Sequence, residues 1–262
     1  MQLLSSRVAR VGVPACGLAA VVFVGSAAQA SVISASDPFI TVHASSGSFS
    51  GTLTVPLGDV ITLSDPDQDL WYWATTNPVP IFDGPNLVAT LVNMTVLAGR
   101  NTQPDGEQRY GIDIDFGVQA GSSNTTFELL SPTLSFGPLT NARGLVSAGL
   151  VGTDQNTNGI AISPMGGNGF AFNAMFNGAA VFRSYFDHVM SNLPSGSVGE
   201  AGNMSPEGVF QPMGTVSNMM SMYQFNVSAG DTAGGTTTYS VAPAPTSIMI
   251  VGLSGLVIGR RR

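Results

Sequence analysis

The sequence predicts an all-β fold, an antiparallel β-sandwich of the jelly-roll or immunoglobulin-like kind, flanked by an N-terminal signal helix and a short C-terminal transmembrane helix. Short runs of alternating or β-branched residues recur along the chain, and Gly, Pro, Asn and Asp separate them. No long interior segment shows the apolar period of a helix. We therefore expect a leader over residues 1–30, a β-sandwich domain over 31–240 and a terminal segment over 241–262.

The strand-like runs follow one another along the predicted domain. They are "FITVH" from Phe39, "GTLTV" from Gly51, "LVATLVNMTVL" from Leu87, "YGIDIDFGV" from Tyr110, "TFELL" from Thr126 and "YQFNVSAG" from Tyr223. In "YGIDIDFGV", Ile112, Ile114 and Phe116 share one face, whereas Asp113 and Asp115 share the other. This alternation is typical of an antiparallel strand with one buried face.

Two stretches predict hairpins. In "FAFNAMFNGAAVFRSYF", Asn177-Gly178 stands between apolar runs, which is a strong short-range hairpin signal. In "GLVSAGLVGTDQNTNGIAISP", a polar turn stands between two strand-like runs. We expect residues 191–220, which are rich in Gly, Ser and Pro, to form an irregular loop.

The N-terminus is typical of a secretory signal peptide. Arg7 and Arg10 precede an apolar stretch over residues 11–24. This stretch is about 14 residues long, which is short of the ~20 that a membrane-spanning helix needs. A small-x-small pattern follows, so we expect signal peptidase to cut before Ser31. The residues that define this cleavage are Ala28, Ala30 and Ser31.

The C-terminus places three features in a fixed order. The first is an extended linker that contains Pro243, Ala244 and Pro245. The second is an apolar tract over residues 248–259, and the third is an arginine cluster that ends the chain. Arginines hold the end of a membrane-inserted segment on the cytoplasmic side, so we expect transient membrane insertion here. The cluster is Arg260, Arg261 and Arg262.

This three-part order resembles a PEP-CTERM sorting signal of the planctomycete type, with Ala244 in place of the usual Glu. The resemblance covers residues 241–262. It implies an exosortase-type transpeptidase as a partner, an inner-membrane-anchored precursor and a mature protein at the cell surface or outside the cell. The alternative interpretation of the same residues is a permanent tail anchor, which the short apolar tract disfavours.

Composition excludes some classes of function. The nine basic residues are all Arg, and only four lie between the two chain ends, against 16 acidic residues, so this interior carries a charge of 4 − 16 = −12. Such a surface repels nucleic acid, and we expect no nucleic-acid partner. The single cysteine, Cys16, lies in the leader, so the mature chain has no disulfide.

Two polar clusters contain the start of a calcium-loop pattern, in which oxygen ligands alternate along the chain. The twelfth loop position, which normally supplies a bidentate carboxylate, would be Thr76 in the first cluster and Met165 in the second, and neither side chain supplies one. We therefore favour polar turns, in which Asp and Asn bind their own backbone, over calcium sites, and we expect no cofactor. The candidate metal ligands are Asp65, Asp67 and Asp69 in the first cluster, and Asp154, Asn156 and Asn158 in the second.

The segment "LWYWATT" offers a candidate ligand-binding surface. In a strand, Trp71 and Trp73 share one face and Tyr72 lies on the other. Exposed indoles would form a platform on which sugar rings stack, whereas buried indoles belong to the core, which is the interpretation we favour. The two histidines, His43 and His188, do not make a zinc site of known spacing.

We expect a non-catalytic exported protein of the cell surface or extracellular matrix. One alternative is a carbohydrate-binding module, with extracellular polysaccharide as its partner, or a calcium-dependent adhesion module. A second alternative is a secreted glycoside-type hydrolase. Such an enzyme needs two carboxyl groups at a set separation across the sugar, and the candidates are Glu128, Glu200 and Glu207.

Overall fold

The computed structural model describes residues 31–192, 196–203 and 209–244, and their regular structure is almost wholly β-strand. One short 3₁₀ turn, η1 (Leu57–Asp59), is the exception. The strands are β1 (Val32–Ile33), β2 (Ile40–Ser46), β3 (Phe49–Val55), β4 (Ile61–Asp65), β5 (Gln68–Thr75), β6 (Val79–Asp83), β7 (Asn86–Thr102), β8 (Gln108–Ala120), β9 (Thr125–Leu130), β10 (Leu134–Thr153), β11 (Ile160–Pro164), β12 (Phe172–Phe176), β13 (Ala180–Tyr185), β14 (Met190–Asn192), β15 (Ser197–Asn203), β16 (Gln211–Val227) and β17 (Thr232–Ala242).

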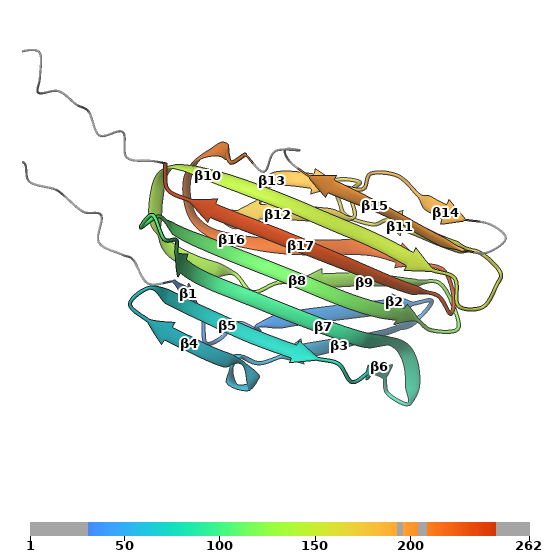
Figure 1. The fold of residues 1–262 in the computed structure, drawn as a ribbon. Coiled ribbons are helices and arrows are strands. Elements are labelled where there is room, and N and C mark those ends of the chain that lie inside the picture. Colours follow the sequence, from blue (N-terminus) through green and yellow to red (C-terminus); the bar gives the residue numbers. More distant parts are fainter. Residues whose placement is uncertain (1–30, 193–195, 204–208, 245–262) are drawn as a thin grey trace, which may run out of the picture.

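The strands form one curled antiparallel sheet whose two halves face each other (Figure 1). The front half runs β4-β5-β7-β8-β17-β10-β15, and β6 continues the edge of β7 beyond β5. The back half runs β3-β2-β9-β16-β12-β13, with β11 and β14 beside the end of β16. The predicted all-β, antiparallel fold is confirmed.

Strand β10 carries the sheet from the back half to the front half. Its first part pairs with β16, from Leu134 opposite Met219 to Gly144 opposite Gln211. Its second part, from Arg143 onward, pairs with β17 and β15 instead. Register shifts and a positive φ at Asn141 mark the bend between these parts. Bulges of this kind bend a strand and allow a sheet to fold over on itself.

The core fills the space between the two halves. Residues of β8 alternate as the sequence predicts: Ile112, Ile114 and Phe116 are buried in it. The Phe116 ring packs edge-on against Tyr223 of β16, with ring centroids 4.9 Å apart, so the front and back halves meet in direct aromatic contact. One continuous hydrophobic cluster therefore joins both halves.

Three connections cross between the halves at one end, and hydrogen bonds join them. They are residues 121–124, 154–159 and 228–231. The buried Asp231 carboxylate accepts hydrogen bonds from the Gln155 amide (3.1 Å) and the Ser228 hydroxyl (2.5 Å). The Gly230 amide donates to the Gly121 carbonyl at 2.8 Å. Asp231 thus stabilises this end of the fold from inside.

Of the two predicted hairpins, the first is confirmed. Strands β12 and β13 pair around Asn177 and Gly178, which have φ values of 49° and 88°. The second prediction is wrong, because β10 and β11 lie in different halves: β10 pairs there with β15 and β17, and β11 pairs with β14 and β16.

The expectation of an irregular loop over residues 191–220 is also wrong in part. This region contains β15, most of which is exposed at the edge of the front half, and the first half of β16. Both predicted terminal helices fall outside the described residues. Within residues 31–192, 196–203 and 209–244, no helix has the length and the apolar character required to span a membrane.

Candidate functional site

The outer face of the front half presents small and polar side chains. On β17, Thr232, Thr236 and Thr238 point outward, because the alternate residues of this strand are buried. Glycines align across neighbouring strands: Gly117 of β8 lies opposite Gly234 of β17. This row continues through Val151 of β10 to Gly199 of β15. Since glycine has no side chain, the row forms the floor of a shallow depression.

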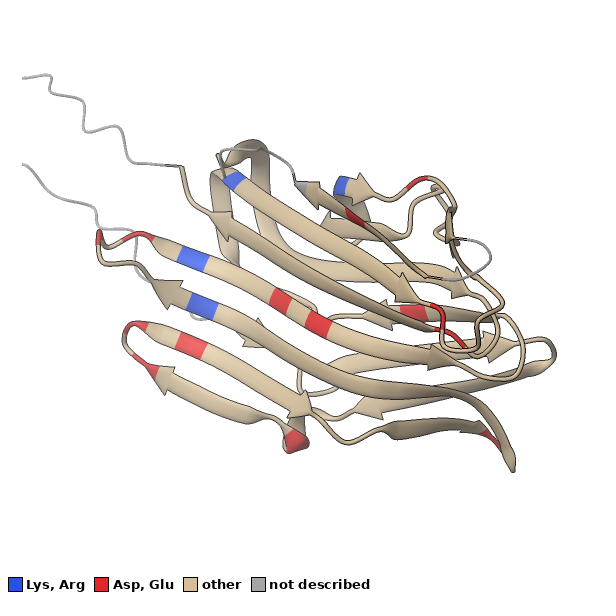
Figure 2. Cartoon of the chain, turned by 45° about the vertical axis from the view of Figure 1, so that its right-hand side comes forward, with Lys and Arg blue, Asp and Glu red and all other residues tan. Residues whose placement is uncertain are grey.

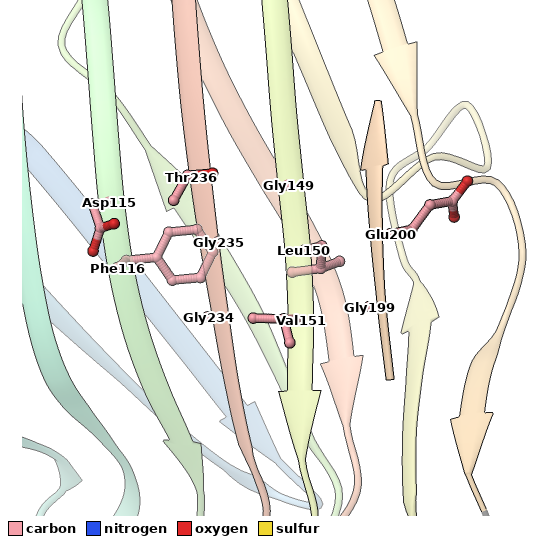
Figure 3. Close-up of a pocket in the computed structure, with 10 residues that line it drawn as sticks. All are labelled: Asp115, Phe116, Gly149, Leu150, Val151, Gly199, Glu200, Gly234, Gly235 and Thr236. Carbon is pink, nitrogen blue, oxygen red and sulfur yellow. The ribbon is translucent and has the colours of Figure 1, made fainter. Parts of the chain in front are cut away.

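Two adjoining depressions occupy this face, with volumes of about 260 Å³ and about 300 Å³. Asp115, Val151 and Gly234 belong to both. Figure 3 shows the first, with Asp115 at one side and Glu200 at the other. Hydroxyl, amide and carboxylate groups of Thr236, Asn93 and Asp115 supply hydrogen-bonding groups around a flat floor. Such a surface can accept a flat or extended polar ligand.

The structure does not bring the hydrolase candidates together. Glu200 lies on the edge strand β15 of the front half, where its carboxylate is 3.4 Å from His188 Nε2. The Glu128 carboxylate accepts a hydrogen bond from the Gln224 side-chain amide at 2.8 Å on the back half. Glu207 lies outside the described residues. Paired acid–base catalysis needs two carboxyl groups that face one site, and Glu128 and Glu200 do not provide it.

Asp113 is the outer-face carboxyl whose pKa is shifted. Burial raises its pKa above the ordinary value, and a hydrogen bond from the Thr238 hydroxyl partly opposes this rise. The group lies two residues from Asp115 on the same face of β8. Its environment is therefore less hydrated than that of its neighbour, which is exposed.

The two tryptophans point inward. Trp71 pairs with Ala98 and Trp73 pairs with Val96, both fully buried, and the indoles pack against the core. Tyr72 is on the opposite face, where it is 37% exposed beside Ile61 of β4. The sequence predicts correctly that the two indoles share a face, and the structure places that face against the core.

The first acidic cluster forms the turn between β4 and β5. Asp65 Oδ1 accepts hydrogen bonds from the amides of Asp67 (2.8 Å) and Gln68 (2.9 Å). The first of these bonds is the main reason that the pKa of Asp65 is lowered. Asp69 points elsewhere, because its Oδ2 pairs with the buried Arg100 guanidinium at 3.0 Å. The three carboxylates therefore do not converge.

The second cluster is also held by its own backbone. The Asp154 carboxylate accepts hydrogen bonds from the amides of Asn156 (3.0 Å), Thr157 (2.7 Å) and Gly159 (3.0 Å). Desolvation would raise the pKa of Asp154, but these bonds together lower it. Asn156 donates to the Ala229 carbonyl, and the Asn158 amide donates back to Asn156. These are the hydrogen bonds that the polar-turn interpretation requires. Across the described ranges, no group of three or more His, Cys, Asp or Glu side chains has a metal-binding arrangement.

The exposed His188 contacts two carboxylates. Its Nδ1 lies 3.2 Å from Asp187 and its Nε2 lies 3.4 Å from Glu200. His43 instead lies 2.9 Å from the Thr52 hydroxyl on the paired strand β3. The two histidines thus belong to separate surface contacts, and both are structurally explained.

The sequence did not predict a cluster of charged and aromatic side chains beside Pro243, directly after β17. The Glu107 carboxylate pairs with the guanidinium groups of Arg109 and Arg143, and both guanidinium carbons lie over the Phe210 ring. Arg143 also donates from Nε to the Pro243 carbonyl at 3.3 Å. Figure 2 shows that the basic residues of β7, β8 and β10 gather at this end of the front half. In the sequence, the one signal that could have pointed to Arg109 and Arg143 is the small number of basic residues between the chain ends.

Pro243 and Ala244 are the two residues of the predicted sorting motif that the structure describes, and they directly follow β17. Pro245 and the three terminal arginines lie outside the described residues, as do Ala28 and Ala30. Ser31 begins the described chain and precedes β1. Comparison with known protein families, with curated proteins and with solved structures finds no match to this chain.

Proposed function

We propose that the chain is a non-catalytic exported protein of the cell surface or extracellular matrix, delivered by its two terminal segments. In this proposal signal peptidase cuts before Ser31. An exosortase-type transpeptidase then acts on the segment after the Pro-Ala-Pro motif, while the precursor is anchored in the inner membrane. We further propose that the curled sheet functions as a β-sandwich module of the jelly-roll or immunoglobulin-like class.

The observation that carries the proposal is how the folded domain ends. Strand β17 lies between β8 and β10 and is paired along its length to Ala242, and the next residue begins the Pro-Ala-Pro motif. The paired part of the sheet therefore ends at Ala242, directly before the motif. A sorting signal that begins after the last described strand fits removal after export.

Both ends of the domain also meet the same strand. Val32 pairs with Ser135 and Ala242 pairs with Arg143, both on β10. Cleavage before Ser31 and after the Pro243–Pro245 region would therefore leave every described strand of the sheet intact.

Intact-mass analysis of the protein recovered from its own cells tests the proposal. We expect a mature chain that begins at Ser31 and lacks everything after the Pro243–Pro245 region. Replacing Arg260, Arg261 and Arg262 together with Ser should abolish this processing, because each arginine costs about 2.5–3.5 kcal/mol near the bilayer centre and so opposes translocation. Replacing Arg183 with Ser is the matched control and should leave the mass unchanged. An intact tail on most surface molecules would show a permanent anchor instead.

The outer depressions favour a second candidate, the binding of extracellular polysaccharide. The polar rim around the glycine floor supports it, whereas the inward-facing Trp71 and Trp73 do not contribute. Affinity electrophoresis in gels that contain neutral polysaccharides measures such binding. Thr236→Lys should weaken retention by filling the depression, and Thr52→Lys on the back half is the control. Equal retention of both variants would contradict this candidate.

A further inference from the structure

Arg143 occupies the point where the sheet turns from back to front. Its Cα is paired with Pro212 on one side and with Ala242 on the other, and a register shift immediately precedes it. The side chain therefore starts between the beginning of β16 and the end of β17. From there Nε reaches the carbonyl of Pro243, at 3.3 Å.

The guanidinium of Arg143 is held from two other sides. The Glu107 carboxylate, whose side chain is 14% exposed, accepts from Arg143 through one oxygen and from Arg109 through the other, the latter at 2.8 Å. The Phe210 ring centroid lies 5.1 Å from the guanidinium carbon of Arg143. Charge-assisted hydrogen bonds are stronger than neutral ones, and an aromatic ring attracts a cation over its face.

We propose that Arg143 is a positioning residue that clamps the start of the Pro-Ala-Pro motif onto the folded domain. Residues up to Ala242 are protected by the strand ladder, and the bond to Pro243 extends this protection by one residue. The first peptide bonds open to a processing enzyme then lie on the C-terminal side of Pro243. This consequence for processing rests on the proposed function, whereas the clamp itself does not.

Arg143 contacts three segments that are distant from one another in sequence. Glu107 lies in the β7–β8 turn, Phe210 precedes β16, and Pro243 follows β17. Arg143 contacts all three, whereas Arg109, within the described residues, pairs with Glu107 and lies over Phe210. Arg143 thus links Pro243 to the rest of the described domain.

Hydrogen–deuterium exchange of the full-length purified chain tests the clamp. In Arg143→Gln, the amides of Val241, Ala242 and Ala244 should exchange about tenfold faster than in the wild type, since the lost hydrogen bond to Pro243 comes from a charged donor and such bonds are stronger than neutral ones. Arg183→Gln, which removes an arginine from β13, should not change this exchange. Exchange of residues 40–55 in β2 and β3 reports whether each variant is folded. Unchanged exchange at Val241, Ala242 and Ala244 in folded Arg143→Gln would overturn the clamp.

Mass analysis of the processed protein from cells separates the clamp from the sorting proposal. With the clamp, wild-type chains should share one C-terminal residue beyond Pro243, and Arg143→Gln chains should end at several positions. Faster amide exchange in Arg143→Gln, together with an uncut C-terminus on wild-type chains, would overturn the sorting proposal and leave the clamp intact. Arg143→Gln chains that end at the wild-type residue would overturn the role of the clamp in processing. If Arg143→Gln does not fold, Arg143→Lys, which keeps the charge but loses the paired geometry, is measured in the same way.

Discussion

Two buried tyrosines in the same core differ in one hydrogen bond. The Tyr223 hydroxyl donates to carbonyl oxygens of the front half, at 2.6 Å from Thr236 and 3.2 Å from Gly149. The Tyr239 hydroxyl is buried and has no hydrogen-bond partner in the described structure. Burial raises the pKa of both phenols, so both remain neutral. Their contributions to stability should therefore differ in sign or size.

We expect Tyr223→Phe to lower the free energy of unfolding by about 0.5–1.5 kcal/mol, since it removes a satisfied hydrogen bond that links the two halves and leaves two carbonyl oxygens without that donor. Tyr239→Phe should be neutral or stabilising, because it removes a polar group that is buried without a partner. Urea unfolding followed by tryptophan fluorescence measures both. A larger loss in Tyr239→Phe than in Tyr223→Phe would contradict this assignment.

Asp113 predicts a dependence of stability on pH. Burial raises its pKa in the folded protein above the value of the unfolded chain. Between these two pKa values the folded state keeps a proton that the unfolded state has lost, so stability falls as pH rises through this window. Asp113→Asn removes this loss. Its stability relative to the wild type should therefore increase from near pH 3 to near pH 7.

Chemical denaturation at both pH values measures this difference. Thr236→Val, an outward-facing substitution on β17 that involves no titratable group, is the control, and its stability relative to the wild type should be the same at both pH values. A relative stability of Asp113→Asn that decreases toward neutral pH would have the wrong sign for a raised pKa.

At this scale the sequence predicts which side chains share a face but not which face is buried. In β8 the alternation is sufficient to predict the buried face, because one face is apolar and the other carries Asp113 and Asp115. In β5 both faces are apolar, since Trp71 and Trp73 alternate with Leu70 and Tyr72. Only the pairing of β5 with β7 decides that the indoles face the core. The Arg143 cluster depends entirely on such long-range pairing and leaves no local pattern.

At the scale of one element, the β12–β13 turn requires a left-handed backbone. Gly178 has a φ of 88°, and a Cβ added there would meet no atom within 4 Å. Any loss from Gly178→Ala therefore comes from backbone strain and not from a clash. We expect about 1–2 kcal/mol of destabilisation. The measurement is the midpoint of thermal or urea unfolding.

Gly58 in η1 supplies the matched control. A Cβ there also meets no atom within 4 Å, and its φ is not positive. Gly58→Ala should change stability by less than about 0.5 kcal/mol, as expected at an ordinary surface site. Equal effects at Gly178 and Gly58 would show that the turn tolerates another conformation.

Long strands explain why the element boundaries were harder to predict than the elements. Strand β10 has 20 residues, and its alternation is interrupted by Gly137, Pro138 and the bend near Asn141, so its first half does not look like part of the same strand. The polar loop over residues 154–159 resembles a hairpin turn. It instead crosses between the halves, because Asp231 and Asn156 attach it to the neighbouring crossover. Local turn chemistry does not distinguish these two connections.

At the scale of the whole molecule, the last strand completes the middle of the sheet. Strand β17 is the final described strand, yet it lies between β8 and β10 and supplies Tyr239, Val241 and Ala242 to the core. Without β17, the backbone N–H and C=O groups that β8 and β10 direct toward it would lose their hydrogen-bond partners. Because such contacts join distant parts of the chain, we expect folding to be slow and the sheet to close only once β17 has been synthesised.

Two truncations test this dependence. A chain that ends at Ala244 keeps β17 and the Arg143 contact to Pro243, so it should unfold in one cooperative transition and give a β-sheet circular dichroism spectrum. A chain that ends at Gly230 loses β17 together with Asp231, whose carboxylate joins the 154–159 connection to the 228–231 connection, and should fail to fold or should aggregate through the exposed edges of β8 and β10. The free energy lost with the backbone pairing and buried side chains of β17 should exceed the ~5–15 kcal/mol by which a folded domain is typically stable. Coincident unfolding curves by fluorescence and circular dichroism would establish the cooperativity of the longer chain. A folded, protease-resistant chain ending at Gly230 would show that the two halves of the sheet can close without their central strand.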